Sequence, residues 1–296
     1  MIYNHIFELI GNTPILKVDD ENNSTVFAKL EMFNPGGSIK DRIAYEMIED
    51  LKKEGLLNKN TKIVEATSGN TGIGIAMVLA SYGYSITIVM PENMSKERQD
   101  LMKAYGATIV LTKADKGMQG AENKAQEMEK EGYFFINQFE NKANLHAHYK
   151  TTAEEIIKDF PNGIDYFVAG VGTAGTLIGC GKRLKEKFPN IKIVAVEPAE
   201  SAVLEGGKSG KHNIQGIGAG FVPPLYDKSL VDEIIKIKTA DAEKETNMLA
   251  KEGLLLGISS GAAILASKKI AKMHKGAQII CICPDGGIKY LSTGIY

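Results

Sequence analysis

The stretch IDYFVAGVGTAGTLIGCGKRLKEKF, residues 164–188, constrains the fold more than any other part of the chain. Residues 164–169 form an apolar run typical of a buried strand, and residues 176–188 have the pattern of a helix. Between the two lie Gly170, Gly172 and Gly175. This Gly-x-Gly-x-x-Gly spacing, placed between a strand and a helix, is typical of a turn that binds phosphate.

Two kinds of phosphate ligand fit this turn. A dinucleotide is one, because Glu197 ends the next apolar run about 20 residues on, where a ribose-binding carboxylate is expected. A single phosphate group is the other, and Glu197 is then the end of a strand entering a turn. The glycine spacing alone does not distinguish an NAD enzyme from an enzyme with another phosphorylated cofactor.

Strand-like and helix-like segments alternate along most of the chain, which predicts an α/β fold with parallel sheets covered by helices. The expected helix at residues 38–55 carries one apolar stripe. Its members are spaced four residues apart: Ile39, Ile43, Met47 and Leu51. About nine strand-like runs in 296 residues suggest two α/β domains, each of three αβα layers with a mostly parallel, twisted sheet.

The composition is that of an ordinary globular protein, with 44% hydrophobic and 24% charged residues. A net charge of −1 gives no electrostatic reason to expect nucleic acid or an anionic membrane as partner. No apolar run is long enough to span a bilayer, and the N-terminal residues do not resemble a secretion signal. Three cysteines, at 180, 281 and 283, favour a cytoplasmic location over a disulfide scaffold. His146 and His148 lack an evident third ligand, so no metal site is expected.

The stretch NPGGSIKDR, residues 34–42, predicts a turn followed by a helix that starts at Ser38. Ser38 and Asp41 have the spacing of a capping box, which puts Lys40 in the first helical turn. A cation gains nothing from the positive end of a helix. Lys40 is therefore either a solvated surface lysine or an amine kept neutral for Schiff-base chemistry.

Two further loops follow strands. EATSGNTGIG, residues 65–74, places small polar side chains and glycines before a helix, which suits either a carboxylate or phosphate site or an ordinary capped turn. Asp285, in CPDGGIKYLST, follows an apolar strand, and open α/β sheets bind ligands at that end of their strands. Asp285 is therefore either a ligand-site residue or an ordinary turn residue. Cys281 and Cys283 share one face of that strand and are expected in the core.

Taken together, these motifs resemble the cysteine synthase (O-acetylserine sulfhydrylase) family, which belongs to the β-family, or fold type II, of pyridoxal-phosphate enzymes. The resemblance covers essentially the whole chain. It is carried, in order, by ELIGNTPIL, NPGGSIKDR, TSGNTGIG, MPENMSKER, NQFENKANLHAHYKTT, QGIGAGF, EGLLLGISSGAA and YLST. The resemblance favours a single cofactor phosphate over a dinucleotide at the glycine turn.

The resemblance implies roles for individual residues. Lys40 matches the Schiff-base lysine, Asn70 matches the asparagine on the phenolic oxygen of the cofactor, and Asp285 aligns with the residue facing the pyridine nitrogen. The residues matching the substrate carboxylate site are Thr67, Ser68, Thr71 and Gln138. Those matching the phosphate cup are Gly172, Thr173, Ala174, Gly175 and Thr176. Ala174 stands where the family commonly has glycine, and departures at Ala202, Glu205, Ile288 and Lys289 leave the fine specificity open.

The resemblance also implies the domain arrangement and the partners. Residues 36–144 are expected to form a smaller, mobile domain that closes on the substrate. Residues 10–35 and 145–296 are expected to form a larger domain that binds the cofactor phosphate, with pyridoxal 5′-phosphate in the cleft between the two. A homodimer is expected, and the C-terminus of serine acetyltransferase is a possible partner.

The expected reaction is cysteine formation from O-acetylserine and sulfide. The alternatives are release of hydrogen sulfide from cysteine with addition of water to give serine, a cystathionine β-synthase-type reaction, and, more remotely, an NAD-dependent dehydrogenase. Hydration would benefit from a carboxylate that orients water. Among Glu205, Asp227 and Asp232, we expect Asp232 in this role, because it adjoins the strand-like run EIIKI.

Overall fold

The chain divides into two compact units in the computed structural model, which describes residues 2–296. Unit 1 consists of the segment that ends at Ile10 together with Asn34–Asn144. Unit 2 consists of Gly11–Phe33 and Leu145–Tyr296. Each unit contains its own β-sheet, and the strands are parallel except for one pair in unit 2. The predicted α/β architecture with mostly parallel sheets is confirmed.

The sheet of unit 1 has four parallel strands in the order β5-β4-β3-β6. Its strands are β3 (Ile63–Ala66), β4 (Thr87–Pro91), β5 (Thr108–Thr112) and β6 (Phe134–Phe135). Its helices are α1 (Lys40–Lys53), α2 (Asn70–Ser81), α3 (Lys96–Ala104) and α4 (Gly117–Lys130), with short 3-10 turns η1 (Ile6–Leu9) and η3 (Ala114–Lys116). The stripe predicted for the first helix is buried as expected, since Ile39, Ile43, Met47 and Leu51 are each at most 5% exposed.

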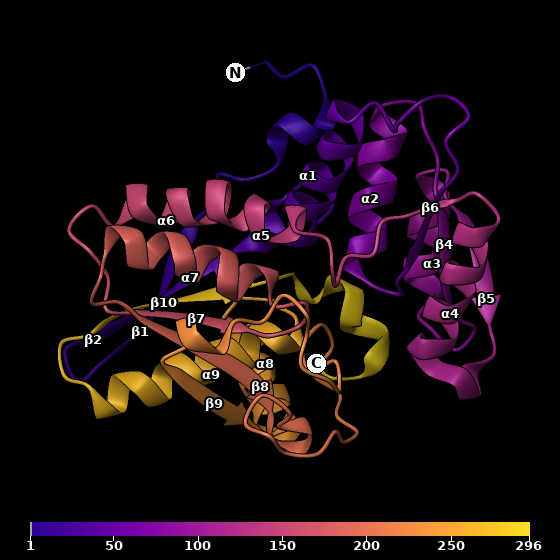
Figure 1. The fold of residues 1–296 in the computed structure, drawn as a ribbon. Coiled ribbons are helices and arrows are strands. Elements are labelled where there is room, and N and C mark those ends of the chain that lie inside the picture. Colours follow the sequence, from indigo (N-terminus) through magenta and orange to yellow (C-terminus); the bar gives the residue numbers. More distant parts are fainter. Residues whose placement is uncertain (1) are drawn as a thin grey trace. The chain divides into compact units, whose positions relative to one another are not determined.

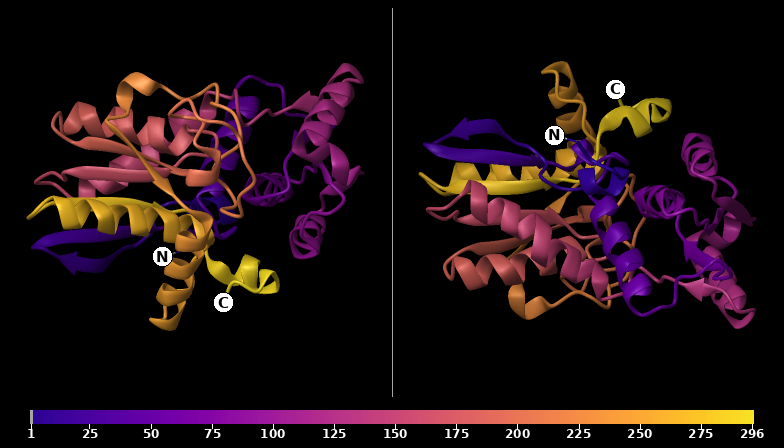
Figure 2. Two further views of the ribbon diagram at one scale, coloured as in Figure 1. Left: turned by 90° about the horizontal axis from the view of Figure 1, so that it is seen from below. Right: turned by 90° about the horizontal axis from the view of Figure 1, so that it is seen from above.

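The sheet of unit 2 has six strands in the order β1-β2-β10-β7-β8-β9. These are β1 (Ile15–Glu21), β2 (Ser24–Leu30), β7 (Tyr166–Gly170), β8 (Lys192–Pro198), β9 (Glu233–Ile237) and β10 (Gln278–Cys283). Its longer helices are α6 (Ala153–Asp159), α7 (Gly175–Lys187), α8 (Thr239–Lys251) and α9 (Ile258–Met273). Helices α6 and α7 cover one face of this sheet, and α9, with α8 packed on it, covers the other (Figures 1 and 2).

Short segments complete unit 2. Helix α5 (Ala143–Ala147) begins in the last two residues of unit 1 and continues into unit 2, where the π-helical turn η4 (His148–Thr152) connects it to α6. The 3-10 turns are η2 (Glu31–Phe33), η5 (Ala199–Ser201), η6 (Lys228–Leu230) and η7 (Gly287–Thr293). Cys180, Cys281 and Cys283 are buried and none of the three forms a disulfide; for Cys281 and Cys283 a place in the core was expected.

Strand β1 is absent from the strands expected from the sequence, and it pairs antiparallel with β2. The two strands are joined by Asn22 and Asn23, whose φ values of 56° and 59° lie in the left-handed region. Two consecutive residues with positive φ are typical of a type I′ hairpin turn, in which asparagine is favoured. The Asn-Asn pair was therefore a signal for this hairpin. It was easily overlooked because the acidic residues around it weaken the strand pattern.

The direction of the strands in unit 2 decides which loops lie together. Strands β2, β10, β7, β8 and β9 are all parallel, so the segments that follow them gather at one edge of the sheet, here called the carboxyl edge. The glycine turn follows β7 and Asp285 follows β10, so both lie at the carboxyl edge. Segments that precede these strands lie at the opposite, amino edge.

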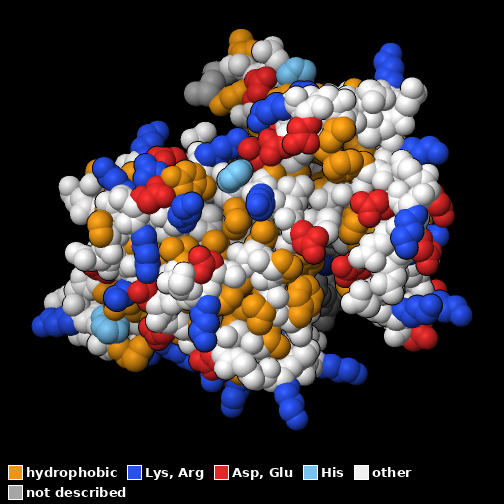
Figure 3. All heavy atoms as spheres, in the orientation of Figure 1, with side chains coloured by type: hydrophobic (Ala, Val, Ile, Leu, Met, Phe, Trp, Pro, Cys, Tyr) orange, Lys and Arg blue, Asp and Glu red, His pale blue; other side chains and the backbone are white. Residues whose placement is uncertain are grey.

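The surface seen in Figure 3 mixes basic and acidic side chains, with apolar side chains between them. This agrees with a net charge of −1 and gives that face no strong field of one sign. Among residues 2–296, no helix combines the length and the apolar character needed to cross a membrane.

Candidate active site

The segment NPGGSIKDR forms a tight turn that leads into α1. Lys40 is the first residue of the helix, two positions later than the predicted start, and its N–H donates to Oγ of Ser38 over 3.1 Å. The buried carboxylate of Asp41 accepts the N–H of Gly36 over 2.6 Å. A Cβ on Gly36 would lie 2.5 Å from Oδ1 of Asp41, so the turn requires glycine there. Lys40 is thus half-buried on a closely constrained turn.

The loop TSGNT connects β3 to α2. Thr67 is buried and its hydroxyl accepts the N–H of Gly69 over 3.3 Å, while Asn70 opens the helix. Thr71 is also buried, and its hydroxyl donates to Oε1 of Gln138 over 2.6 Å. The structure therefore brings Gln138 to the start of α2, although 67 residues separate it from Thr71. Amide groups at the start of a 12-residue helix, beside these hydroxyls, suit a carboxylate.

Glycine in α2 lets this loop approach the turn that carries Lys40. A Cβ on Gly74 would lie 3.1 Å from Cβ of Ala44 and 3.2 Å from the carbonyl oxygen of Lys40. The N-terminal halves of α1 and α2 therefore pack closely, and a side chain at position 74 would require its neighbours to shift by a few tenths of an ångström. Within unit 1, the predicted Schiff-base lysine and the predicted substrate loop are thus neighbours.

In unit 2, the glycine turn after β7 forms a cup at the start of α7. A Cβ on Gly172 would lie only 2.3 Å from the carbonyl oxygen of Gly216, so no side chain fits at this position. Ala174 caps the helix with a φ of 70°, a left-handed conformation that glycine adopts more easily. Gly175 begins the helix, and its N–H lies 3.4 Å from the hydroxyl of Thr173. A glycine-lined turn at the start of a 13-residue helix fits a phosphate group.

The segment QGIGAGF, residues 215–221, forms one wall of this cup. Besides the close approach of Gly216, the N–H of Gly218 donates to the carbonyl of Val171 over 2.9 Å. A Cβ on Gly170 would lie 2.7 Å from the side chain of Ile217. Residues 215–221 therefore pack so closely on the turn that Gly170 and Gly172 have no room for a side chain.

His148 contacts the predicted phosphate cup, although the sequence suggested it only as a possible metal ligand. It is fully buried in η4, where Nδ1 lies 3.0 Å from the hydroxyl of Thr152 and Nε2 lies 3.1 Å from the hydroxyl of Thr176. Thr176 belongs to the predicted phosphate cup, so this histidine fixes the position of a cup hydroxyl. A π-helical turn of this kind frequently marks a functional site. The sequence signal was the histidine's place in HYKTT, four residues before Thr152.

Asp285 is buried at the carboxyl edge, immediately beyond β10 and beside the start of α9. Its Oδ2 accepts the hydroxyl of Tyr290 over 2.8 Å, and its backbone oxygen accepts the N–H of Gly257 over 3.1 Å. A Cβ on Gly257 would lie 2.0 Å from Oδ1 of Asp285, so this approach also requires glycine. Tyr290, from the YLST motif, is a second residue whose part in the site the motif alone did not reveal.

The other carboxylates of unit 2 have structural partners. Glu205 forms an ion pair of 2.5 Å with Lys236, and Asp227 accepts the N–H and the hydroxyl of Ser229, which lower the pKa of Asp227. Glu197 is buried and accepts the N–H of Leu204 over 2.9 Å, and burial raises its pKa. A carboxyl buried and bound in this way is poorly suited to reach a ribose.

The structure corrects the expectation for Asp232. This residue precedes β9, and its backbone N–H donates to the carbonyl of Ile193 at the start of β8, so it lies at the amino edge of the sheet. Its carboxylate forms ion pairs with Lys185 and Lys192 and accepts the N–H of Ile193. Burial raises its pKa, but these partners outweigh burial and hold the pKa below its usual range. The prediction failed because it used proximity to a strand without the direction of the strand.

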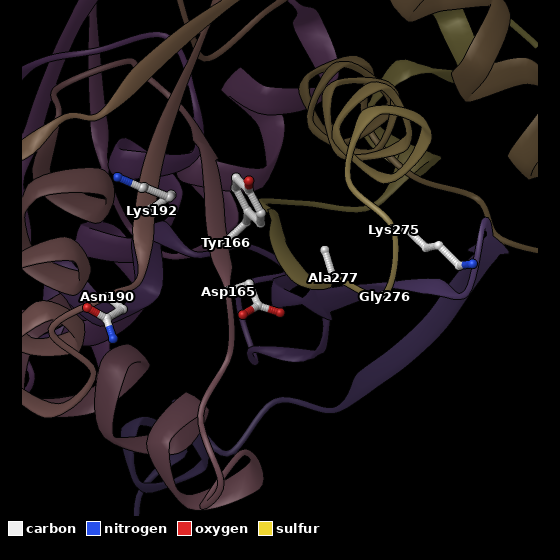
Figure 4. A pocket seen from close by; sticks show the side chains of 7 residues that line it. All are labelled: Asp165, Tyr166, Asn190, Lys192, Lys275, Gly276 and Ala277. Carbon is white, nitrogen blue, oxygen red and sulfur yellow. The ribbon is translucent and has the colours of Figure 1, made fainter.

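A shallow cavity of about 310 Å³ opens at this same amino edge (Figure 4). It is lined by Asp165, Tyr166, Asn190, Lys192, Lys275, Gly276 and Ala277. None of these residues belongs to the glycine cup or to the surroundings of Asp285, which lie at the other end of the strands. The cavity is therefore separate from the candidate site.

Comparison with known proteins places these features in context. A model of the family described as pyridoxal-phosphate dependent enzyme matches residues 6–285. A cysteine synthase from Staphylococcus aureus is 50% identical, with 99% of this chain and 96% of the relative covered. The crystal structure of a cysteine synthase from Entamoeba histolytica has a TM-score of 0.97 at 47% identity, covering 100% of this chain and 91% of the other. A hydrogen sulfide-producing enzyme from Fusobacterium nucleatum has a TM-score of 0.93, also at 47% identity, with 98% of each chain covered.

Proposed function

Since the chain belongs to the pyridoxal-phosphate dependent enzymes, and among them to the cysteine synthase family, we propose that it forms cysteine and acetate from O-acetylserine and sulfide. One observation carries the proposal in the structure. The backbone at Lys40 packs against α2 at Gly74, and the start of the same helix, formed by TSGNT, suits an amino acid carboxylate; this supports a role for Lys40 beside the substrate.

Three parts of the chain would bind the cofactor. The cup Gly172–Thr176 would hold the cofactor phosphate through backbone N–H groups, with Thr176 oriented by His148. Asn70 would contact the phenolic oxygen, and the Asp285 carboxylate would face the pyridine nitrogen and favour its protonated form. When bound, pyridoxal phosphate supplies an electron sink for the charge that develops at the substrate α-carbon.

Lys40 has two tasks in this proposal. Its Nζ would link the cofactor covalently before the substrate arrives, and the substrate amine would then take its place on the cofactor and release it. The freed Nζ would take the proton from the substrate α-carbon. The substrate loop, formed by Thr67, Ser68, Thr71 and Gln138, would hold the carboxylate so that the α-proton faces Lys40. Acetate leaves from the β-carbon, and sulfide adds there to give cysteine.

A second candidate is release of hydrogen sulfide from cysteine, with water in place of sulfide as the second nucleophile. It is favoured by a relative of equal identity, 47%, whose name describes hydrogen sulfide production. The experiment that separates the candidates compares kcat/KM for O-acetylserine plus sulfide with kcat/KM for cysteine alone, and identifies the amino acid product. Serine plus homocysteine, in a third reaction, tests cystathionine formation. Preferred release of sulfide from cysteine would overturn the first candidate.

The proposal extends to the setting of the enzyme. A homodimer is supported by large apolar side chains on the surface, such as Tyr3, Ile6 and Leu9, each more than 40% exposed. A cytoplasmic location is supported by three cysteines, none of which forms a disulfide. Light scattering of the purified protein, alone and with the C-terminal peptide of a serine acetyltransferase, tests both the dimer and that partner.

A further inference from the structure

Glu65 is an acidic residue inside an apolar strand of unit 1. It is the third residue of β3, which lies between β4 and β6, and it is 1% exposed. Its neighbours Val64 and Ala66 pack into a core cluster with residues of α4, such as Ala121 and Ala125. The side chain of Glu65 points to the other face of the strand, where it is equally buried. Burying a carboxyl is unfavourable unless it makes hydrogen bonds, so its partners indicate why it is there.

All the partners of Glu65 belong to the segment that follows β6. Oε2 accepts the N–H of Asn137 over 2.9 Å, and Oε1 accepts the N–H of Gln138 over 3.4 Å. Asn137 has a φ of 53°, so the chain turns sharply at this point. One carboxyl therefore holds two successive backbone amides of a turn.

The contacts of Gln138 connect this turn to the substrate loop. Its Oε1 accepts the hydroxyl of Thr71 over 2.6 Å, and its backbone oxygen accepts Nδ2 of Asn144 over 2.8 Å. Because Oε1 of Gln138 accepts this hydroxyl, the NH₂ group of the same amide is left to donate to an incoming carboxylate.

We propose that Glu65 is a positioning residue, which holds the backbone turn that places Gln138 for binding of the substrate carboxylate. This rests on the proposed role of Gln138 in that binding. Glu65 itself touches neither substrate nor cofactor in this scheme. Its influence passes through Gln138 and then Thr71.

A neighbouring carboxylate offers a matched comparison. Glu92 follows β4, and its Oε1 accepts the N–H of Ala114 in the loop after β5 over 3.2 Å. It therefore makes the same kind of bond from a strand end to the loop beyond a neighbouring strand. Glu92 is exposed, and Ala114 has no place in the substrate loop. A purely structural carboxylate of this kind is the proper control.

The test uses the holoenzyme and the variants Glu65→Gln and Glu92→Gln. In Glu65→Gln, an NH₂ group replaces one acceptor and faces a backbone N–H. We expect the KM for O-acetylserine to rise about tenfold, the effect of one lost hydrogen bond, with kcat within about threefold of wild type. Hydrogen exchange of residues 136–144 should accelerate. Glu92→Gln should change neither KM nor exchange in that segment. An unchanged KM in Glu65→Gln would overturn the proposal.

A double-mutant cycle shows whether the effect passes through Gln138. In a Gln138→Ala background, Glu65→Gln should raise KM less than twofold further, because the side chain that it places is gone. A full tenfold increase in that background would contradict the proposal. If Glu65→Gln does not fold, Glu65→Asp provides the same test, since its shorter chain reaches only one of the two amides.

Failure of the inference is distinguishable from failure of the proposed function. If the wild type does not convert O-acetylserine, the proposed function is wrong, whatever the variants do. If the wild type is active but the Glu65 and Gln138 substitutions are additive, the function stands and the positioning role falls.

Discussion

Lys40 is the residue on which the proposed chemistry depends. Lys40→Ala should fold normally, because the bonds from the Gly36 N–H to Asp41 and from the backbone N–H of residue 40 to Ser38 remain. We expect loss of the visible absorbance of lysine-bound cofactor and a fall in kcat of at least about a thousandfold. The measurement is absorbance after removal of free cofactor, with borohydride reduction and mass mapping.

The control for this experiment lies on the same helix. Lys53 ends α1, is exposed, and forms an ion pair of 3.2 Å with Asp50. Lys53→Ala should keep both the absorbance and the activity. Recovery of the reduced cofactor on any lysine other than Lys40 would refute the assignment.

Gly172 makes the closest backbone approach in the phosphate cup. Gly172→Ala would put a methyl group 2.3 Å from the carbonyl oxygen of Gly216, and a backbone atom cannot rotate away as a side chain can. We expect displacement of the 215–221 wall, a loss of about 1–3 kcal/mol in unfolding free energy, and at least about tenfold weaker cofactor binding. Cofactor titration and thermal unfolding measure the two effects.

Ala174→Gly, in the same cup, is the control for Gly172→Ala, because it removes a methyl group instead of adding one. The φ of 70° at Ala174 strains alanine by about 1–2 kcal/mol, while glycine loses more entropy on folding and removes a buried methyl. These effects nearly cancel, so Ala174→Gly should leave stability within about 1 kcal/mol and retain the cofactor. Equal cofactor affinity in Gly172→Ala and Ala174→Gly would show that the cup is not where phosphate binds.

Among secondary-structure elements, β2 and α6 are linked by a buried ion pair. Lys29 of β2 is 0% exposed, lies 2.8 Å from the carboxylate of Glu155 in α6, and donates to the carbonyl of Thr13. Glu155→Gln would leave a buried ammonium group without its counter-ion, which costs about 3–5 kcal/mol of unfolding free energy. Denaturant unfolding of the Glu155→Gln and Lys29→Met variants measures this.

The pairing itself is tested by combining the two changes. The double variant should lose less stability than the sum of the single variants, because no buried charge is left unpaired. The exposed pair Lys17–Asp20 is the control, and Asp20→Asn should have no measurable effect. Additive losses for Lys29 and Glu155 would show that the two charges do not interact.

The elements also show how far the sequence could predict this fold. The sequence predicted two local features correctly, because each depends on residues close together in the chain. They are the apolar stripe of α1 and the glycine turn between β7 and α7. Asp232 was misplaced, because a residue next to a strand can lie at either edge of the sheet. Only the strand direction, a property of the whole sheet, places it at the amino edge.

Contacts between segments far apart in the chain could not be predicted from the sequence pattern either. Gln138 was predicted for the substrate loop from a family motif, but its bond to Thr71 spans 67 residues. The only sequence signal for Glu65 was an acid in an apolar strand, and its partners Asn137 and Gln138 lie about 70 residues away. Similarly, 28 residues separate His148 from Thr176. Such pairs arise from the packing of elements, which no local pattern records.

At the scale of the whole molecule, Glu65 predicts how stability depends on pH. Burial raises its pKa from 4.5 to about 8, against the hydrogen bonds from Gln138 and Asn137 and with a small contribution from Glu122. Between pH 4.5 and 8 the folded protein therefore holds a proton that the unfolded chain has lost. Raising the pH through this window favours the unfolded state, so stability falls until about pH 8 and then levels off.

The size of this effect is on the order of a few kcal/mol, since each pKa unit corresponds to about 1.4 kcal/mol. A neutral amide at position 65 carries no titrating proton, so Glu65→Gln should flatten the decline between pH 5 and 8 without removing the loss of stability in stronger acid. That loss arises from carboxyls whose pKa is lowered by partners, such as Asp232 and Glu49. The measurement is the unfolding midpoint of the substrate-free holoenzyme across this range, with Glu92→Gln alongside. A Glu65→Gln profile parallel to that of wild type would mean that Glu65 is ionised throughout, and that its hydrogen bonds outweigh its burial.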